Sequence, residues 1–87
     1  MMRYHYRSDV LAQLWGHGVQ PRQTTAPELV RGYVNDLYRY ELRKLRDRLL
    51  VGEVARSAYY ELVVQIRNRY RVLALKAPQW LVRKEIP

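Results

Sequence analysis

The stretch LLVGEVARS, Leu49 to Ser57, decides how this chain folds. A periodic apolar pattern runs up to Leu50 and a second one begins at Ser57, so Gly52 to Arg56 forms only a short connection. Two helices joined by so few residues pack side by side and antiparallel. We therefore predict a helical hairpin at the centre of the fold.

The hairpin helices are predicted over residues 25–50 and 57–73. The segment TAPE opens the first of them, with Thr25 as the N-cap, Pro27 in the first turn and Glu28 completing a capping box. Ser57 is the predicted N-cap of the second helix. The glycine after Leu50 ends the first helix.

Shorter elements are expected to close the hairpin. A helix over residues 9–15 follows Ser8, its predicted N-cap, and ends at Gly16. Pro78 prevents a continuous helix in the tail, so Trp80 and its neighbours are expected to fold back as a short turn. The prediction is an all-α fold, one small domain over residues 1–87, frayed at 1–7 and 83–87.

Composition narrows the classes of protein. At 87 residues the chain supports one modest core, to which oligomerisation would add stability. The absence of cysteine excludes disulfides, thiolate metal sites and cysteine nucleophiles. No apolar run reaches the roughly 18 residues of a membrane span. The expected location is a bacterial cytoplasm.

The apolar faces of the two hairpin helices differ in width. The second helix carries one narrow arc, made of Tyr59, Leu62, Val63, Ile66, Tyr70 and Leu73. The first helix carries a matching stripe, Val34, Tyr38, Leu42, Leu45 and Leu49, and beside it a second one, Leu29, Tyr33, Leu37 and Tyr40. We call this second set the tyrosine stripe. One neighbouring helix cannot bury both stripes, so either the short first helix and the Trp80 tail cover the tyrosine stripe, or a second copy of the chain does.

The charge of the chain is strongly basic. Its formal net charge is +8, with thirteen arginines and three lysines, which favours an anionic partner such as nucleic acid. The candidate polyanion-binding residues are Arg39, Arg43, Arg46, Arg67 and Arg71, and antiparallel pairing is expected to bring Arg67, Arg69 and Arg71 toward Arg39 and Arg43. Ion pairs of Arg43 with Asp47 and of Glu41 with Lys44 are expected to relieve some repulsion. A simpler reading makes these arginines the solvated face of a helix.

Catalytic chemistry has little support in the sequence. His5 and His17 are the only histidines, and neither has a second ligand at metal spacing. A solvated or backbone-bonded His17 is the simpler expectation, and an enzyme built around it is the weakest functional hypothesis. We predict a protein that is not an enzyme, with no cofactor, metal or small-molecule substrate.

The segment Leu42 to Leu62 resembles the short helical hairpins called SHOCT domains. Its leucine-rich helix ends in Leu-Leu-x-Gly, and the matching residues are Leu49, Leu50, Gly52, Val54, Ser57 and Tyr60. The resemblance covers about a quarter of the chain and implies a role in interaction or oligomerisation. The leading expectation is therefore a non-enzymatic module that self-associates through the tyrosine stripe. The alternative is a basic accessory protein that binds nucleic acid through its arginines.

Overall fold

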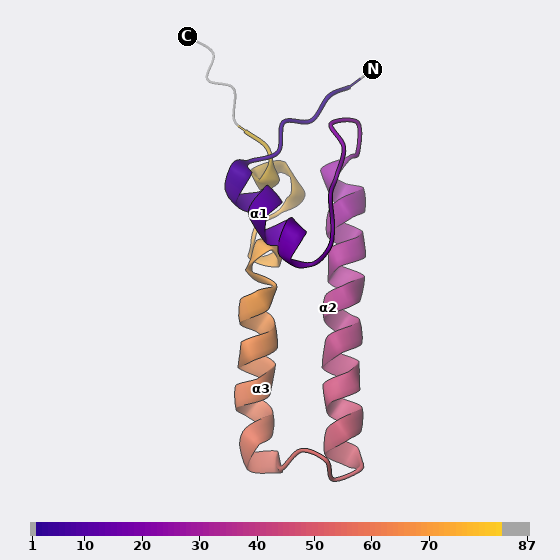
Figure 1. Cartoon of the computed structure of the whole chain (residues 1–87), viewed down its shortest axis with the longest axis vertical. Coiled ribbons are helices and arrows are strands. Elements are labelled where there is room, and N and C mark those ends of the chain that lie inside the picture. The colour runs from indigo at the N-terminus through magenta and orange to yellow at the C-terminus, as the bar shows by residue number, and fades with distance from the viewer. Residues whose placement is uncertain (1, 83–87) are drawn as a thin grey trace.

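The computed structural model of the chain describes residues 2–82. Three α-helices, α1 (Ser8–Gly16), α2 (Pro27–Leu50) and α3 (Arg56–Arg69), are followed by two 3₁₀ turns, η1 (Arg71–Ala74) and η2 (Ala77–Trp80). α2 and α3 run side by side and antiparallel, which confirms the predicted all-α fold and its hairpin (Figure 1). The described residues form no strand, only an isolated bridge between Tyr6 and Leu81.

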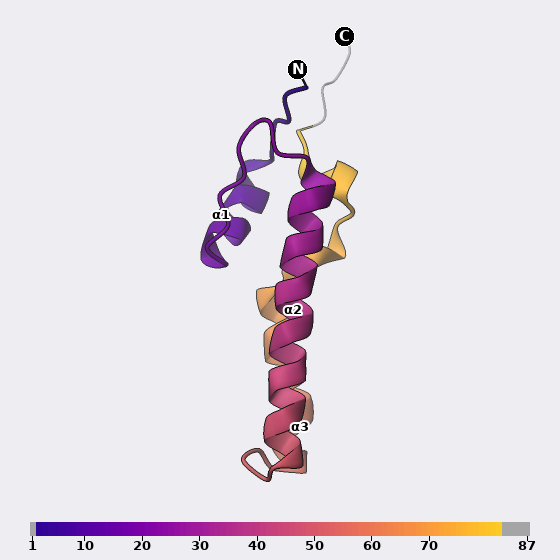
Figure 2. The ribbon, with the colours of Figure 1, turned by 90° about the vertical axis from the view of Figure 1, so that its right-hand side faces the viewer.

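The molecule is elongated. Its radius of gyration is 16.0 Å, whereas a compact chain of this length has about 12 Å. α1, η1 and η2 gather around the N-terminal half of α2, and we call this end the terminal lobe (Figures 1 and 2). The other end, the stalk, consists of α2 and α3 alone. Each stalk helix therefore has a neighbour on one side only.

Two sets of side chains form one continuous core. Between α2 and α3 lie Val34, Leu45, Ile66 and Tyr70, all from the two facing stripes that the sequence predicted. In the terminal lobe, Val10, Leu14, Val72 and Trp80 are completely buried, at 0% exposure. The indole Nε1 of Trp80 donates to the Val72 carbonyl at 3.0 Å, so this ring is buried without an unsatisfied polar group.

Residues near the two ends of the described chain hold one another in place. The Arg7 amide donates to the Trp80 carbonyl at 2.8 Å, and the Val82 amide donates to the His5 carbonyl at 2.7 Å. The Tyr6 hydroxyl donates to the Thr25 carbonyl at 2.6 Å. The segment preceding α1, which the sequence predicted to fray, is hydrogen-bonded to two parts of the chain: the returning tail supplies the partners of His5 and Arg7, and the loop before α2 supplies those of Tyr4 and Tyr6. The fraying predicted for residues 83–87 concerns residues outside those described.

None of the three predicted N-caps caps its helix. α2 begins at Pro27 after Ala26, and no side chain caps it. The Thr25 hydroxyl instead accepts from the Arg22 amide at 3.1 Å, within the preceding turn. Proline removes one of the N–H groups that a cap satisfies, so the start of α2 needs less help. Ser8 and Ser57 lie inside their helices, which begin at Ser8 and Arg56.

The largest difference between predicted and observed helix boundaries is at the end of α3. α3 ends at Arg69 rather than near residue 73, because Tyr70 leaves the helical conformation at φ −109° and ψ 35°. Tyr70 stays in the hairpin core, while the 3₁₀ turn after it directs Val72 toward Trp80. At the other end of the hairpin the prediction holds: α2 stops at Leu50, and Gly52 has φ +82°, a conformation that favours glycine.

Candidate interaction surfaces

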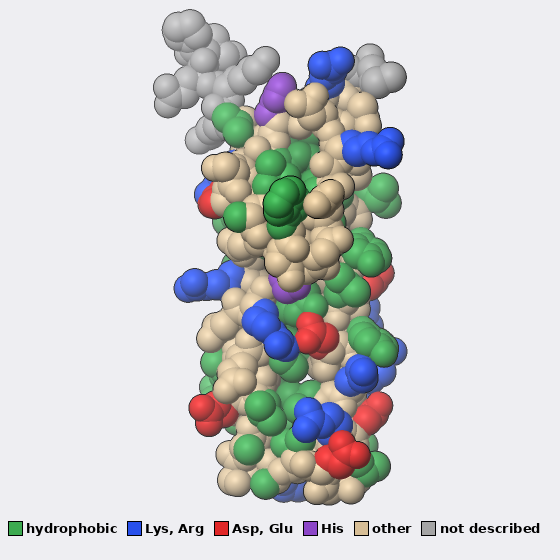
Figure 3. All heavy atoms as spheres, viewed as in Figure 1, with side chains coloured by type: hydrophobic (Ala, Val, Ile, Leu, Met, Phe, Trp, Pro, Cys, Tyr) green, Lys and Arg blue, Asp and Glu red, His purple; other side chains and the backbone are tan. Residues whose placement is uncertain are grey.

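The tyrosine stripe remains uncovered in the described part of the chain. Leu29 is 71% exposed, Tyr33 57% and Tyr40 55%, while Leu37 is half-buried against the core. α1 packs on η1, and the 3₁₀ turns pack on α2 beside the core, so none of these elements covers the stripe as one alternative had expected. Figure 3 shows hydrophobic side chains gathered along the α2 edge of the molecule.

Charged residues lie among the tyrosines of this surface. Asp36, Lys44 and Asp47 are all exposed, and none takes part in an ion pair among residues 2–82. The Lys44 ammonium lies 5.4 Å from the centre of the Tyr40 ring, a cation–π distance. The ion pairs expected between Arg43 and Asp47 and between Glu41 and Lys44 are not formed. Glu41 pairs with Arg69 instead, and the other three side chains have no ion-pair partner among residues 2–82.

The arginines predicted to bind a polyanion line two adjoining grooves on another face of the hairpin. One groove is lined by Arg39, Leu42, Arg43, Arg46, Tyr59 and Val63. The other is lined by Tyr38, Arg67, Asn68, Tyr70, Arg71, Leu73, Ala74 and Leu75. The grooves adjoin because Tyr38 and Leu42 are one turn apart on α2, as are Val63 and Arg67 on α3. We call Arg39, Arg43, Arg46, Arg67 and Arg71 the arginine face.

The electrostatics of this face are one-sided. No acidic residue lines either groove. None of its five arginines forms an ion pair within the described residues, where the paired arginines are Arg7, Arg48 and Arg69. The five guanidinium groups therefore keep their donors for water or for a ligand.

Two further arginines near this face make contacts within the protein. Arg69 does not join the arginine face, since its guanidinium pairs with Glu41 at 2.8 Å on the other side of the hairpin. Arg31, which the sequence did not single out, donates from Nε to the Leu75 carbonyl at 2.9 Å and from a terminal nitrogen to the Leu73 carbonyl at 2.8 Å. It fastens α2 to the segment after α3 and adds a positive charge next to the groove that Leu75 lines.

His17 belongs to a polar cluster between the terminal lobe and the hairpin. Its Nε2 lies 2.7 Å from the Arg69 carbonyl, and its ring stacks on Tyr70 with centroids 4.1 Å apart. The Tyr70 hydroxyl donates to Glu41. Burial, and then this hydrogen bond to a carboxylate, raise the pKa of Tyr70 to about 12. The imidazole is backbone-bonded, as the simpler reading expected, and it ties the loop after α1 to the end of α3.

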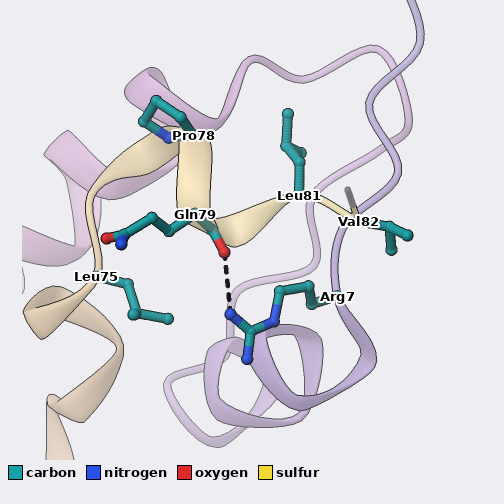
Figure 4. A pocket seen from close by; sticks show the side chains of 6 residues that line it. All are labelled: Arg7, Leu75, Pro78, Gln79, Leu81 and Val82. Carbon is teal, nitrogen blue, oxygen red and sulfur yellow. Dashed lines mark hydrogen bonds between the residues drawn. The ribbon is translucent and has the colours of Figure 1, made fainter. Parts of the chain in front are cut away.

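A groove in the terminal lobe is largely apolar. Its lining residues are Arg7, Leu75, Pro78, Gln79, Leu81 and Val82 (Figure 4). The Arg7 guanidinium donates to the Gln79 carbonyl at 3.1 Å and pairs with Asp9 at 2.6 Å. The hydrogen bonds that Arg7 donates to Asp9 hold the pKa of the Asp9 carboxyl below its usual range. The one charged side chain of the groove is thus engaged inside the protein.

Comparison with known proteins returned no similar family model, curated protein or solved structure. The resemblance to SHOCT hairpins therefore rests on the residues between Leu42 and Leu62 alone. Among residues 2–82, no helix is long and apolar enough to cross a membrane. The same residues contain no group of three histidine, aspartate or glutamate side chains placed to hold a metal ion.

Proposed function

We propose that this chain is a small cytoplasmic interaction module without enzymatic activity, which self-associates through the tyrosine stripe. One observation carries the proposal: α2 exposes Leu29, Tyr33 and Tyr40 on one side while its opposite side is buried against α3. Exposed apolar residues in a row of this kind are typical of protein–protein interfaces, where tyrosine is enriched.

The shape of the molecule supports the same function. A two-helix stalk buries one side of each helix, so its core is smaller than that of a compact domain of equal length. A second copy that covers the tyrosine stripe buries its apolar surface. Each Å² of apolar surface removed from water stabilises the dimer by about 25 cal/mol. Because the stripe is short, we expect a dimer that forms at micromolar concentration rather than an obligate one.

The test is the concentration dependence of the molar mass, measured by analytical ultracentrifugation. The wild-type protein is expected to shift from one chain toward two over the micromolar range, and Tyr33→Glu to weaken this association by at least about tenfold. Tyr60→Glu is the matched control, because Tyr60 is 74% exposed on α3 and lies outside the stripe. A wild-type monomer at high micromolar concentration contradicts the proposal, as does equal weakening by both substitutions.

A second candidate function is binding of a nucleic-acid backbone by the arginine face. The specific observation is the set of five unpaired arginines around grooves that no carboxylate lines. Arginine donates two parallel hydrogen bonds to a phosphate, and the half-buried Tyr38 and Tyr59, which line the grooves, add aromatic rings for contact with sugars or bases. Residues 2–82 form neither a helix-turn-helix nor an RNA-binding sheet, so the expected binding is independent of sequence.

Fluorescence anisotropy with mixed-sequence RNA and DNA over a salt series tests this function. Five phosphate contacts predict a slope of log affinity against log salt of about −3.5 for a single strand. The double substitution Arg39→Gln with Arg43→Gln is expected to make that slope less steep by about 1.4, since each contact contributes about 0.7 to its magnitude. Arg3→Gln with Arg22→Gln removes the same charge from exposed residues elsewhere and serves as the control. Equal effects of the two double variants contradict the assigned face.

A further inference from the structure

The exposed residues on the outer side of α2 are arranged symmetrically about Tyr40. At 4, 7 and 11 residues before it lie Asp36, Tyr33 and Leu29, and at the same separations after it lie Lys44, Asp47 and Val51. Separations of 4, 7 and 11 residues return to the same side of an α-helix, so the six residues within α2 form one row, and Val51, the residue directly after α2, continues it. All seven are exposed, and Lys44 lies beside the Tyr40 ring.

The chemistry of the row is self-complementary. When two such helices pair antiparallel about Tyr40, each residue meets the residue at the opposite separation in the other copy. Leu29 then meets Val51, which are both apolar and 71% exposed. Tyr33, a hydrogen-bond donor, meets the Asp47 carboxylate, and Asp36 meets Lys44, which has the opposite charge. Each of these pairs occurs twice in the dimer.

We propose that two copies of the chain pair α2 against α2 in antiparallel orientation, with a two-fold axis passing beside Tyr40. The inference rests on the proposed self-association and adds the orientation, the register and the pairing residues. The occupant is a second copy because charge complementarity favours it: Asp36 and Lys44 have no ion-pair partner among the described residues of their own chain. A parallel pair about the same residue would place Asp36 against Asp36 and Lys44 against Lys44, which is unfavourable.

The outline of the molecule favours the same orientation. The terminal lobe thickens the end of the hairpin where α2 begins, and the stalk at the other end is bare (Figures 1 and 2). An antiparallel pair places each lobe beside the stalk of the other copy. A parallel pair brings the two lobes to the same level. Figure 3 shows hydrophobic, acidic and basic side chains interspersed along the α2 edge of the molecule.

Charge reversal tests the register. Asp36→Lys alone and Lys44→Asp alone each replace two attractive contacts of the dimer by two repulsive ones. Each is expected to weaken dimerisation by about tenfold, in line with measured energies of exposed ion pairs. The double variant Asp36→Lys with Lys44→Asp restores opposite charges and is expected to recover wild-type affinity within about threefold. Glu61→Lys, an exposed reversal on α3, is the control for net charge.

Cysteine cross-linking tests the orientation, because the chain has no cysteine of its own. Leu29→Cys and Val51→Cys are purified separately, distinguished by a mass tag, mixed and treated with a short bifunctional maleimide. The antiparallel dimer predicts the cross-link between the two variants. It predicts none between two copies of Leu29→Cys, since residues 29 and 51 are about 33 Å apart along α2 at 1.5 Å per residue.

The outcomes separate this inference from the proposed function. A dimer that cross-links Leu29→Cys to itself, or that both single charge reversals leave unchanged, overturns the antiparallel arrangement and leaves self-association intact. A wild-type protein that stays monomeric, with its stripe covered only by a different protein, overturns both. Circular dichroism of each variant confirms that its helical content is unchanged, so loss of the dimer is not loss of the fold.

Discussion

Removing the Tyr70 hydroxyl should lower stability at neutral pH and make the protein less sensitive to alkaline pH. Tyr70→Phe deletes a hydrogen bond to the Glu41 carboxylate from a side chain that is only 5% exposed. Hydrogen bonds to charged groups are worth about 1.5–3 kcal/mol. Glu41 keeps its ion pair with Arg69 and remains reachable by water. We therefore expect the free energy of unfolding at pH 7 to fall by about 1 kcal/mol.

The alkaline effect follows from the raised pKa. The pKa of Tyr70 is about 12 in the folded protein, because burial and the hydrogen bond to Glu41 both favour the protonated form. In the unfolded chain it returns to about 10. Stability from this group is thus fully present below pH 10 and is lost as pH rises from 10 toward 12. A difference of about two pKa units corresponds to at most about 2.7 kcal/mol.

Tyr6 also has a raised pKa, so it contributes to the loss of stability at alkaline pH in both the wild type and Tyr70→Phe. Burial and then the nearby Glu28 raise its pKa to about 12. The wild-type protein should therefore lose up to about 5 kcal/mol from these two groups between pH 10 and 12, and Tyr70→Phe about half of that.

Urea unfolding followed by circular dichroism, repeated at steps from pH 7 to 12, measures both effects. Tyrosinate absorbance in the folded protein reports the two late-titrating groups directly. Tyr60→Phe, which removes an exposed hydroxyl, should match the wild type at every pH. An alkaline loss in Tyr70→Phe as large as that of the wild type would show that the Tyr70 hydroxyl titrates normally and that the argument from burial is wrong.

Three further substitutions have expected outcomes that urea unfolding can check. Trp80→Ala empties the completely buried site in the terminal lobe and should cost about 3–5 kcal/mol, and a loss below 1 kcal/mol would contradict the assigned core. Gly52→Ala forces a side chain into φ +82° at the hairpin turn and should cost about 1 kcal/mol. Gly32→Ala should have the opposite sign, a gain of about 0.5–1 kcal/mol, because Gly32 is an exposed residue within α2 and a Cβ there meets nothing within 4 Å. Equal signs for the two glycine variants would mean that backbone conformation does not govern them.

The hairpin could be predicted from sequence because its signals are local. Gly52 and the two apolar patterns around it decide where the chain turns and which sides of the helices meet, and the structure has both as predicted. The helix starts were less predictable. Thr25, Ser8 and Ser57 are all good N-cap residues, but a competing turn takes the Thr25 hydroxyl and the other two helices begin one residue or more earlier than expected.

The position of the terminal lobe could not be predicted by projecting one helix at a time. A projection shows that α2 has two apolar stripes, but it does not show that α1 packs on η1 and leaves Tyr33 and Tyr40 exposed. The arginines illustrate the same limit. Arg69 and Arg67 are two residues apart on α3, so they point to different sides, and only the position of Glu41 across the hairpin decides that Arg69 is the paired one.

The contact between the two ends of the described chain has a consequence for biosynthesis. α1 and Tyr6 are made early, yet their packing and hydrogen-bond partners include Val72, Trp80 and Leu81, which are translated only after the whole of α2 and α3. The hairpin turn at Gly52 needs only its own neighbours and can form as soon as α3 has left the ribosome. The nascent chain therefore carries Val10 and Leu14 without their final partners until the segment that follows α3 has been made. Truncation just before Trp80 should leave a helical stalk with an unpacked N-terminal segment that proteases cut first.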